Sequence, residues 1–508
     1  MLVQRLAVDD SFAATFCRGD AQRASHIPRV TNCIALILLA LVSLALLDQQ
    51  LGRASEASLN AQLHAAMQRE LPPGCALSIQ AVDVETGRIL MEHAADTPLC
   101  PASTMKIITT AAALAYFKPD YTFVTEVFVE GARGSRAKTL YLRGGGDPRL
   151  VSEQLFLLAK EVVDSGLEEL TGDLVVDDAY YEPSPPLDEA DKLGLRSYHA
   201  PYGALSLNFN SIKVVIYPGP RVGAAARVLL DPWSGYADLR ANVTTVAGDK
   251  PAQTNIGKQA KPGGEIIRVS GEIGVDAPPK KRYVNVAHPA LYTGEVFKQY
   301  LIQAGVPVRG RVVKGQTPDD ARLLVSFPSQ PLAMNVYWLN KFSNNFMAEQ
   351  IAMGLGAAIF GPPGTREKGL AALREYLIAC GVPEGHFRLA EASGLSRSNR
   401  VSASALVKVL LSAYRDFSYG YEFVSSLSIS GTDGTLREKF VGSGLERLIR
   451  AKTGTLKGVN ALAGYWRWKD GRVAAFAILV NSQQPNAGIV DYADRIARAV
   501  FSLPLRNQ

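Results

Sequence analysis

The stretch PASTMKI, Pro101–Ile107, places Ser103 three residues before Lys106 at the start of an apolar run. The run keeps helical spacing as far as Lys118, which a proline follows, and it predicts a helix with Ser103 in or next to its first turn. Residues three apart share one face of a helix. A serine hydroxyl needs a base beside it to act as a nucleophile, and a lysine can serve when burial and a nearby cation lower its pKa. The stretch therefore predicts a nucleophile and its base.

Two further short motifs follow in order, SNN at 343–345 and KTG at 452–454. The first motif alone is weak evidence, because short patterns recur by chance. All three in this order are the signature of serine β-lactamases and penicillin-binding proteins, in which the second motif usually reads SDN. Taken alone, SNN would suit a helix cap and KTG a strand that ends in a turn, and capping is compatible with catalysis.

The sequence around the motifs strengthens this interpretation. The flanks read PASTMKI, FSNNFMAEQI and RAKTGTL, with ASGLSRSNRVSA and GTDGTLR between the last two. From about residue 71 to about residue 500 the chain resembles the class C low-molecular-mass penicillin-binding proteins, the D-alanyl-D-alanine carboxypeptidase/endopeptidase family. The resemblance implies an α/β (α+β) fold with a five-stranded antiparallel sheet of the transpeptidase/β-lactamase type, flanked by helices, and with extra domains inserted between the first and second motifs.

The resemblance also implies a reaction and a role for four side chains. Ser103 would attack the carbonyl of the penultimate D-alanine of a peptidoglycan stem peptide, and neutral Lys106 would take its proton. Ser343 would pass a proton to the departing amine, while Asn345 would hydrogen-bond the substrate amide and the lysine. The expected protein is a serine D-alanyl-D-alanine carboxypeptidase, with D,D-endopeptidase activity left open. β-Lactam antibiotics are expected to acylate Ser103 and to be released slowly.

The third motif is expected to bind the substrate. Lys452 and Thr453 would lie on an edge-like strand, where an extended peptide can add and where an ammonium and a hydroxyl suit a terminal carboxylate. Gly454 would leave room for that approach. The family's oxyanion hole implies the backbone N–H groups of Ser103 and Thr455. Losing one such donor typically costs ~3 kcal/mol of transition-state stabilisation.

Apolar patterning predicts the sheet and the domain order. We expect strands at residues 75–83 and 88–93 and at 448–456, 461–468 and 473–481, with a tight turn at 469–471 and a closing helix at 489–501. Residues 58–120 and 316–508 would then form the catalytic domain. The interval between the first two motifs is far longer than one helical subdomain needs, so residues 121–315 are expected to form inserted domains. Their β-rich part is expected at about 211–315.

Residues 1–57 have the character of a leader. The run at 33–47 carries no charge and is nearly all apolar, a length that favours a signal-peptide core over a spanning helix. Small residues at 55 and 57 would allow cleavage before Ser58. The segment ahead of the run is long for a signal peptide, so an uncleaved membrane anchor is the alternative. Either alternative exports the rest of the chain, to the periplasm or otherwise outside the cytoplasmic membrane.

Composition and cysteine usage limit the partners. The chain has 508 residues with 54 basic and 48 acidic side chains, a net charge of +6, and no basic run suggests nucleic acid. Scattered histidines and the lack of CxxC or HExxH predict no metal site, and no cofactor is expected. Outside the leader lie Cys75, Cys100 and Cys380; a disulfide between the first two and three separate thiols both stay open. The oligomeric state is not indicated.

Three other functions are weighed against the carboxypeptidase. A β-lactamase would share the chemistry but deacylate fast, and the long insertion and the flanks disfavour it. A non-catalytic peptidoglycan-binding protein would keep the fold without the reaction, and the three intact motifs argue against it. A membrane-anchored structural protein rests only on the leader. No motif for a second base that activates water is evident, so the rate of deacylation stays open.

Overall fold

The computed structural model describes residues 60–70, 73–182, 200–249, 251–468, 471–482 and 491–501. The expected leader lies outside these residues, as do part of the turn at 469–471 and the start of the closing helix. In this described part of the chain, no helix combines the length and the apolar character needed to cross a membrane. Cys75, Cys100 and Cys380 are free thiols, so the structure has the unbridged alternative.

One antiparallel sheet joins strands from both ends of the described chain. Its order is β18 (Ser428–Ile429), β19 (Ile449–Leu456), β20 (Val459–Arg467), β21 (Val473–Ser482), β1 (Cys75–Asp83) and β2 (Ile89–His93). The five predicted strands are thus confirmed, with ends that differ by a residue or two. The sixth, β18, was not predicted, because two residues are too few to show an alternating pattern.

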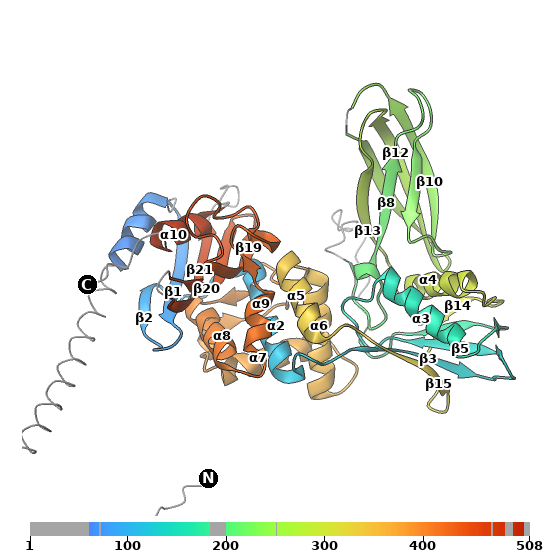
Figure 1. Cartoon of the computed structure of the whole chain (residues 1–508), viewed down its shortest axis with the longest axis horizontal. Coiled ribbons are helices and arrows are strands. Elements are labelled where there is room, and N and C mark those ends of the chain that lie inside the picture. Colours follow the sequence, from blue (N-terminus) through green and yellow to red (C-terminus); the bar gives the residue numbers. More distant parts are fainter. Residues whose placement is uncertain are drawn as a thin grey trace, which may run out of the picture. The chain divides into compact units, whose positions relative to one another are not determined.

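Helices cover both faces of this sheet (Figure 1). The hydroxyl of Tyr465 on β20 donates to the Leu410 carbonyl of α8 (Ala403–Arg415) at 2.7 Å. Its neighbour Trp466 stacks on Phe501 of α10 (Tyr492–Phe501), with ring centroids 4.0 Å apart. Successive residues of a strand point to opposite faces, so α8 and α10 lie on opposite sides of the sheet. This explains why β20 is buried along nearly its whole length.

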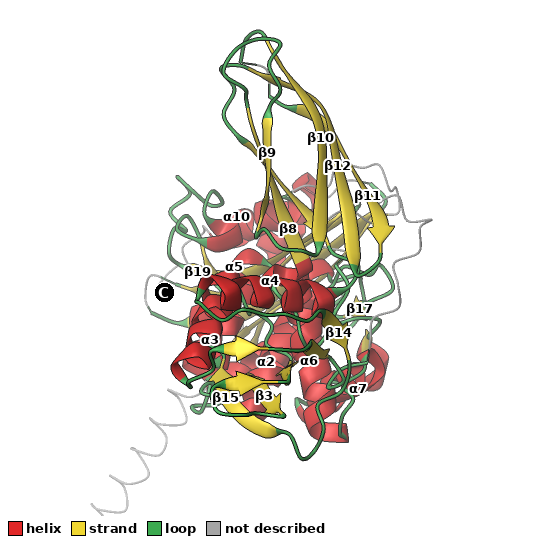
Figure 2. Cartoon of the chain, turned by 90° about the vertical axis from the view of Figure 1, so that its right-hand side faces the viewer, coloured by secondary structure: helices red, strands yellow, loops and turns green. Residues whose placement is uncertain are grey.

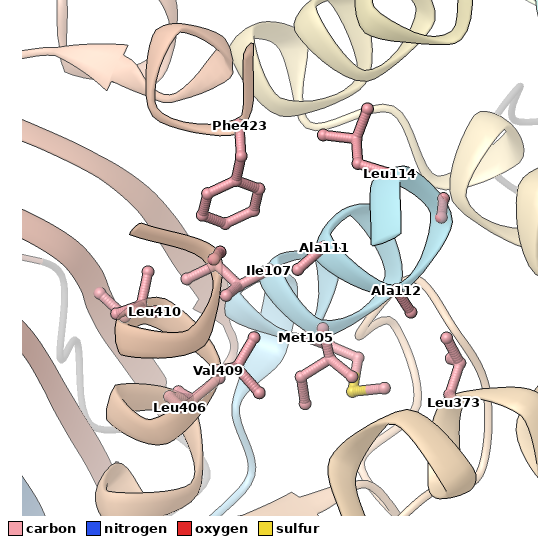
Figure 3. Close-up of a cluster of buried hydrophobic side chains, with 14 of the residues drawn as sticks. Met105, Ile107, Ala111, Ala112, Leu114, Leu373, Leu406, Val409, Leu410 and Phe423 are labelled. Carbon is pink, nitrogen blue, oxygen red and sulfur yellow. The ribbon is translucent and has the colours of Figure 1, made fainter. Parts of the chain in front are cut away.

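The helix that follows Ser103 is the centre of a helical group beside the sheet. This helix, α2 (Met105–Phe117), contacts α8 and four others: α5 (Leu332–Phe342), α6 (Asn345–Phe360), α7 (Arg366–Ala379) and α9 (Gly420–Ser426). Figure 3 shows Met105 and Ile107 among apolar side chains of neighbouring helices, Leu406 and Leu373 among them. Residues 105–114 are all buried, as expected of a helix enclosed on every side. The tightly packed helix therefore holds the backbone of Lys106 in place.

Residues between α2 and α5 build a second sheet. Its order is β14 (Val312–Lys314), β7 (Leu174–Asp177), β5 (Thr139–Arg143), β3 (Val124–Glu130) and β15 (Arg322–Pro328). Two helices, α3 (Ser152–Asp164) and α4 (Pro289–Gln303), pack on it. The strand β15 pairs with β3 and so belongs to the inserted part, although the sequence boundary at residue 315 assigned it to the catalytic domain.

Long strands form two further sheets within the inserted part. One has the order β13 (Lys280–Asn285), β8 (Ser211–Tyr217), β9 (Arg227–Asp231), and the other β10 (Ala237–Val246), β12 (Gly264–Gly274), β11 (Gln253–Lys261). Figure 2 shows β9, β10 and β12 extending beyond α4. The remaining strands are two residues long and form two small two-stranded sheets. They are β4 (Arg136–Ala137) with β6 (Glu169–Leu170), and β16 (Phe387–Arg388) with β17 (Arg400–Val401).

Candidate active site

Ser103 lies in a single 3-10 turn, Ala102–Thr104, directly ahead of α2. The backbone N–H and the hydroxyl of Thr104 both donate to the Pro101 carbonyl, at 3.2 and 2.7 Å, and close this turn. Ala102 has a φ of +45°, a left-handed conformation that is uncommon for a residue with a side chain. Backbone strain of this kind clusters at active sites. Here it occurs next to the predicted nucleophile.

The side chain of Lys106 is completely buried and reaches both the first and the second motif. Its Nζ lies 3.0 Å from Oγ of Ser103 and 2.7 Å from Oδ1 of Asn345, and it also donates to the Ser393 carbonyl. Burial lowers the pKa of Lys106 to about 8, and the nearby charge of Glu391 opposes this lowering. About a tenth of Lys106 is therefore neutral at about pH 7, and a general base needs this neutral form.

Ser343 and Asn345 flank a sharp break between two helices. Ser343 ends α5 in a left-handed conformation, with φ 57° and ψ 40°. Asn344 caps α6 by accepting a hydrogen bond from the Met347 N–H at 3.1 Å, and Asn345 is the first residue of that helix. The helix cap expected from the sequence is thus present at the middle residue. Because of this break, Ser343 contacts Lys452 and Asn345 contacts Lys106.

Polar contacts with neighbouring elements anchor the C-terminal end of α5. Asn340 donates to the hydroxyl groups of Thr110 on α2 and Ser426 on α9, at 3.2 and 2.8 Å. Lys341 is buried, and its Nζ lies 2.7 Å from a carboxylate oxygen of Asp433. Asp433 in turn accepts the Ile429 N–H at 2.8 Å. These bonds tie the second motif to the GTDGT segment near the third.

Lys452 on β19 is the second fully buried lysine of the site. Its Nζ lies 2.9 Å from Oγ of Ser343 and 3.0 Å from the Thr453 carbonyl. Burial, and next the charge of Lys106, place the pKa of Lys452 well below its usual range. Such a lysine gains most from an anionic ligand, because the ligand's charge restores its proton. This fits the carboxylate contact expected of the third motif.

The edge of β19 is open along the third motif. On that side β18 pairs only with Arg450 and Ala451, and no other strand within the described residues pairs beyond them. Thr453 instead directs its hydroxyl to Oγ1 of Thr435, at 2.8 Å. The edge-like strand predicted from the sequence is thus present.

Gly454 and Thr455 continue this edge. A side chain on Gly454 would place its Cβ 2.7 Å from the Pro101 carbonyl oxygen, so the glycine allows β19 to pack against the turn that carries Ser103. That room for an incoming peptide also depends on Gly454 stays a prediction. Thr455 is exposed. Its N–H, with that of Ser103, remains the predicted oxyanion hole.

The structure adds four residues that sequence reasoning did not place in the site: Thr435, Ser393, Glu349 and Glu391. Thr435 and Ser393 lie in the segments GTDGTLR and ASGLSR, which were noted only as flanks. Glu349 follows Asn345 by one helical turn, and it is a carboxylate on an otherwise apolar buried helix. That mismatch between charge and expected burial was the signal that could have revealed it.

A pocket of about 890 Å³ borders the second motif. Its walls include Ser343 and Asn344 and, from the inserted part, Arg149, Ser152, Lys213 and Tyr283. Polar and apolar groups both line it, which suits a ligand that combines hydrogen-bonding groups with an apolar part. Among the residues described here, no three His, Cys, Asp or Glu side chains gather as a metal site would require.

The chain as a whole is similar in sequence to a known family and to known proteins. The family model described as "D-Ala-D-Ala carboxypeptidase 3 (S13) family" matches residues 59–500. A D-alanyl-D-alanine carboxypeptidase of Actinomadura sp. is 33% identical over 491 residues, covering 91% of this chain and 88% of that protein. The D-alanyl-D-alanine carboxypeptidase DacB of Haemophilus influenzae is 26% identical over 438 residues, covering 81% and 87%.

A solved structure extends the comparison to the fold. The crystal structure of penicillin binding protein 4 (dacB) from Haemophilus influenzae superposes with a TM-score of 0.72 at 22% identity, covering 86% of this chain and 97% of the other. The overall architecture, with its inserted sheets, is therefore shared. The α/β fold implied by the motifs is confirmed.

Proposed function

This chain belongs to the D-Ala-D-Ala carboxypeptidase 3 (S13) family, and on that premise we propose that Ser103 is its nucleophile and Lys106 the base. The protein is a serine-type D-alanyl-D-alanine carboxypeptidase. One observation carries the assignment of roles: Nζ of the buried Lys106 lies 3.0 Å from Oγ of Ser103. A nucleophile and a base within hydrogen-bond reach, with a third group that orients the base, are the requirement for covalent catalysis. Here Asn345 is that third group, at 2.7 Å from Nζ.

The first half of the reaction forms an ester on Ser103. Oγ of Ser103 attacks the carbonyl carbon of the penultimate D-alanine, and its proton moves to neutral Lys106. The negative charge that develops on the carbonyl oxygen is stabilised by the N–H groups of Ser103 and Thr455. The carbon–nitrogen bond then breaks, and the departing amine takes a proton through Ser343, which the Lys452 ammonium contacts at 2.9 Å. Water later hydrolyses the ester.

The third motif holds the end of the peptide. The stem peptide adds to the open edge of β19, and its terminal carboxylate accepts hydrogen bonds from Lys452 and Thr453. Thr435 fixes the Thr453 hydroxyl, at 2.8 Å. β-Lactams resemble the acyl-D-alanyl-D-alanine group, so they acylate the same serine. We expect their release to be slow, and the labelling experiment below measures it.

Labelling with a fluorescent penicillin tests the assignment. The purified protein is incubated with the drug, as wild type and as Ser103→Ala, and the adduct is mapped by mass spectrometry. We expect one stable adduct on Ser103 and none in the variant, together with loss of D-alanine release from a pentapeptide. Rapid drug turnover without an adduct would indicate a β-lactamase. Intact drug and intact peptide would leave only peptidoglycan binding.

A second activity, D,D-endopeptidase, is favoured by the pocket next to Ser343. A released D-alanine fills little of its 890 Å³, whereas pockets of roughly 300–1,000 Å³ enclose ligands of drug size. The leaving group of a cross-linked substrate is a whole peptide, and Ser343 is the residue that faces the leaving amine in the proposed mechanism. We therefore propose that the pocket receives that peptide.

Two substrates separate the two activities. We expect Tyr283→Ala, which removes an exposed aromatic ring from the pocket wall, to lower kcat/KM for a cross-linked dimer by about tenfold and to leave a monomeric pentapeptide unchanged. Tyr217→Ala, on β8 away from the pocket lining, is the matched control. If the wild type releases D-alanine but leaves the cross-linked dimer intact, the proposed endopeptidase activity is contradicted and the carboxypeptidase activity stands.

Such a substrate lies outside the cytoplasmic membrane, and we propose that the catalytic part works there after export. The apolar run at 33–47 would serve as signal or anchor. Fractionation of cells with and without detergent distinguishes the two, because only an anchored enzyme stays with the membrane pellet until detergent is added.

A further inference from the structure

Two carboxyl groups lie side by side beneath Lys106. Glu349, on the first turns of α6, is only 3% exposed, and Glu391, in the loop before β17, is 9% exposed. The two side chains hydrogen-bond each other. Two carboxylates in such a place cannot both stay ionised, so the pair shares one proton.

Burial raises the pKa of Glu349 well above its usual range. Burial alone would also raise that of Glu391, but hydrogen bonds from Glu349 and Ser393 bring it below its usual value. These directions favour the proton on Glu349 and the charge on Glu391, and the hydrogen bonds around each carboxyl group decide the assignment.

The loop that carries Glu391 supplies the donors that keep it ionised. Its Oε1 accepts the backbone N–H groups of Gly394 and Ser396, at 2.6 and 3.3 Å, and the amide of Asn399. Its Oε2 accepts the N–H of Ser393 at 3.0 Å and the hydroxyl of the same residue. A carboxylate with this many donors is held in its charged form.

Glu349 binds the same loop from the helix side. Its Oε1 accepts the N–H groups of Ala392 and Ser393, at 3.0 and 2.9 Å. An oxygen that accepts twice leaves the other oxygen to carry the proton toward Glu391. Glu349 thus acts as a neutral acid that both anchors the loop and donates to its partner.

The loop so fixed contacts α2 at two points, one of which is Lys106. The Ser393 carbonyl accepts a hydrogen bond from Lys106, and the Ala392 carbonyl accepts the Thr109 hydroxyl at 2.7 Å. Gly394 has a φ of +84°, and a Cβ there would lie 1.8 Å from the carbonyl oxygen of Ala102. The loop backbone therefore packs against the strained residue that precedes Ser103.

We propose that Glu391, kept as a carboxylate by the protonated Glu349, is the buried counter-anion and positioning residue of Lys106. The inference rests on the proposed roles of Ser103 and Lys106. When Ser103 gives its proton to Lys106, a buried ammonium forms, and the charge of Glu391 balances it. The role corresponds to the acidic member of a serine–histidine–aspartate triad, which orients the base and stabilises its charged form without taking the proton.

To balance the charge of Lys106, Glu349 and Glu391 together must carry one negative charge. Two negative charges would hold Lys106 as an ammonium, and none would leave a base too weak to take the proton. Other charged or titratable groups that face the pair include Arg366 of α7, Tyr202, Cys100 and Lys106 itself. The expected state is one shared proton and one charge over the working pH range.

Two isosteric variants test the proposal through the pH dependence of acylation. The rate of labelling by a fluorescent penicillin is measured from about pH 6 to about pH 10 for wild type, Glu349→Gln and Glu391→Gln. Glutamine at 349 keeps the acceptor for the loop and a donor toward Glu391, so its midpoint should match that of the wild type. Glutamine at 391 removes the charge, so its midpoint should fall by about one pH unit and its plateau by about tenfold.

Each alternative outcome has a definite meaning. A lower rate with an unmoved midpoint in Glu391→Gln would make the residue merely structural and overturn the proposal. A shifted midpoint in Glu349→Gln would place the charge on the wrong partner and overturn it as well. If Glu391→Gln does not fold, Glu391→Asp replaces it: the charge stays, so the midpoint should stay, and a shift contradicts the inference. Failure of wild type to label at Ser103 would instead refute the proposed function.

Discussion

The Nζ atom of Lys452 lies 2.9 Å from the Oγ atom of Ser343, so the second and third motifs meet in one hydrogen bond. The first motif contains a matching pair, Lys106 and Ser103, at 3.0 Å. The site thus contains two serine–lysine pairs, and Asn345 contacts the first of them. In the proposed mechanism, one pair supplies the nucleophile and its base, and the other supplies the proton path to the leaving amine and the cation for the carboxylate.

Removing the hydroxyl of Ser343 should interrupt the proton path. In Ser343→Ala we expect acylation by penicillin, and D-alanine release, to fall by a factor on the order of 10² to 10³, because a positioned proton donor contributes roughly 10² to 10⁴. The second-order rate of labelling measures the first effect. Ser425→Ala, on an exposed face of α9, is the control and should leave both rates unchanged. Equal rates in the two variants would rule out a role for Ser343.

The acylation rate of the wild type should rise with pH and be half-maximal near pH 8. Burial lowers the pKa of Lys106 to about 8, and only the neutral amine accepts the proton of Ser103. Below that pH the lysine is protonated and the rate falls about tenfold per pH unit. Stopped-flow acylation measures this profile directly. A rate that is flat between about pH 6.5 and about pH 9 would exclude Lys106 as the base.

Thr453 and Thr435 should act as one unit in binding. Their hydroxyl groups are 2.8 Å apart, so either change to valine removes the same hydrogen bond. We expect each single variant to raise KM for a pentapeptide severalfold, and the double variant to be little worse than Thr453→Val. The double-mutant cycle then gives a coupling energy of about 0.5 to 3 kcal/mol. Fully additive effects would show that Thr435 does not position Thr453.

Asp147 should make the protein less stable as the pH rises through the weakly acidic range. Burial raises its pKa from 3.8 to about 6, so between these values the native protein binds more protons than the unfolded chain, and stability falls with rising pH. Asp147→Asn removes this titration and keeps an acceptor for the Arg149 N–H, which bonds at 2.8 Å.

Thermal unfolding of both proteins at several pH values measures the effect. Above about pH 6 the variant should be more stable by up to about 3 kcal/mol, since one pKa unit corresponds to 1.36 kcal/mol. The difference should vanish below about pH 4. A difference of constant size at all pH values would contradict the assignment.

The elements of the fold that showed a strong pattern were predictable. The strands β1, β19 and β21 were placed within a residue or so, because each is a long apolar run bounded by turn residues. The strand β18 and the assignment of β15 were not, since pairing partners are set by tertiary contacts that leave no local pattern. The helix boundary near 343 agrees with the capping residues of the second motif, and the cap itself is Asn344.

The residues of the site also fall into those that a sequence motif predicted and those that only the fold revealed. The side chains Ser103, Lys106, Ser343, Asn345, Lys452 and Thr453 were all named from motifs, and the structure brings them together. Their support was not predicted. Glu349 and Glu391 lie 42 positions apart in the chain, and only the folded loop brings their carboxyl groups together.

The unpaired edge of β19 also bears on what the enzyme leaves alone. An open edge with free backbone groups can pair with any extended chain, which is why most sheets shield theirs. Here the edge strand itself carries the fully buried Lys452, which gains from an anionic partner, and a free carboxylate offers what a neutral amide lacks. We therefore expect the edge to favour an extended peptide with a free carboxylate over the neutral strand of a folded protein.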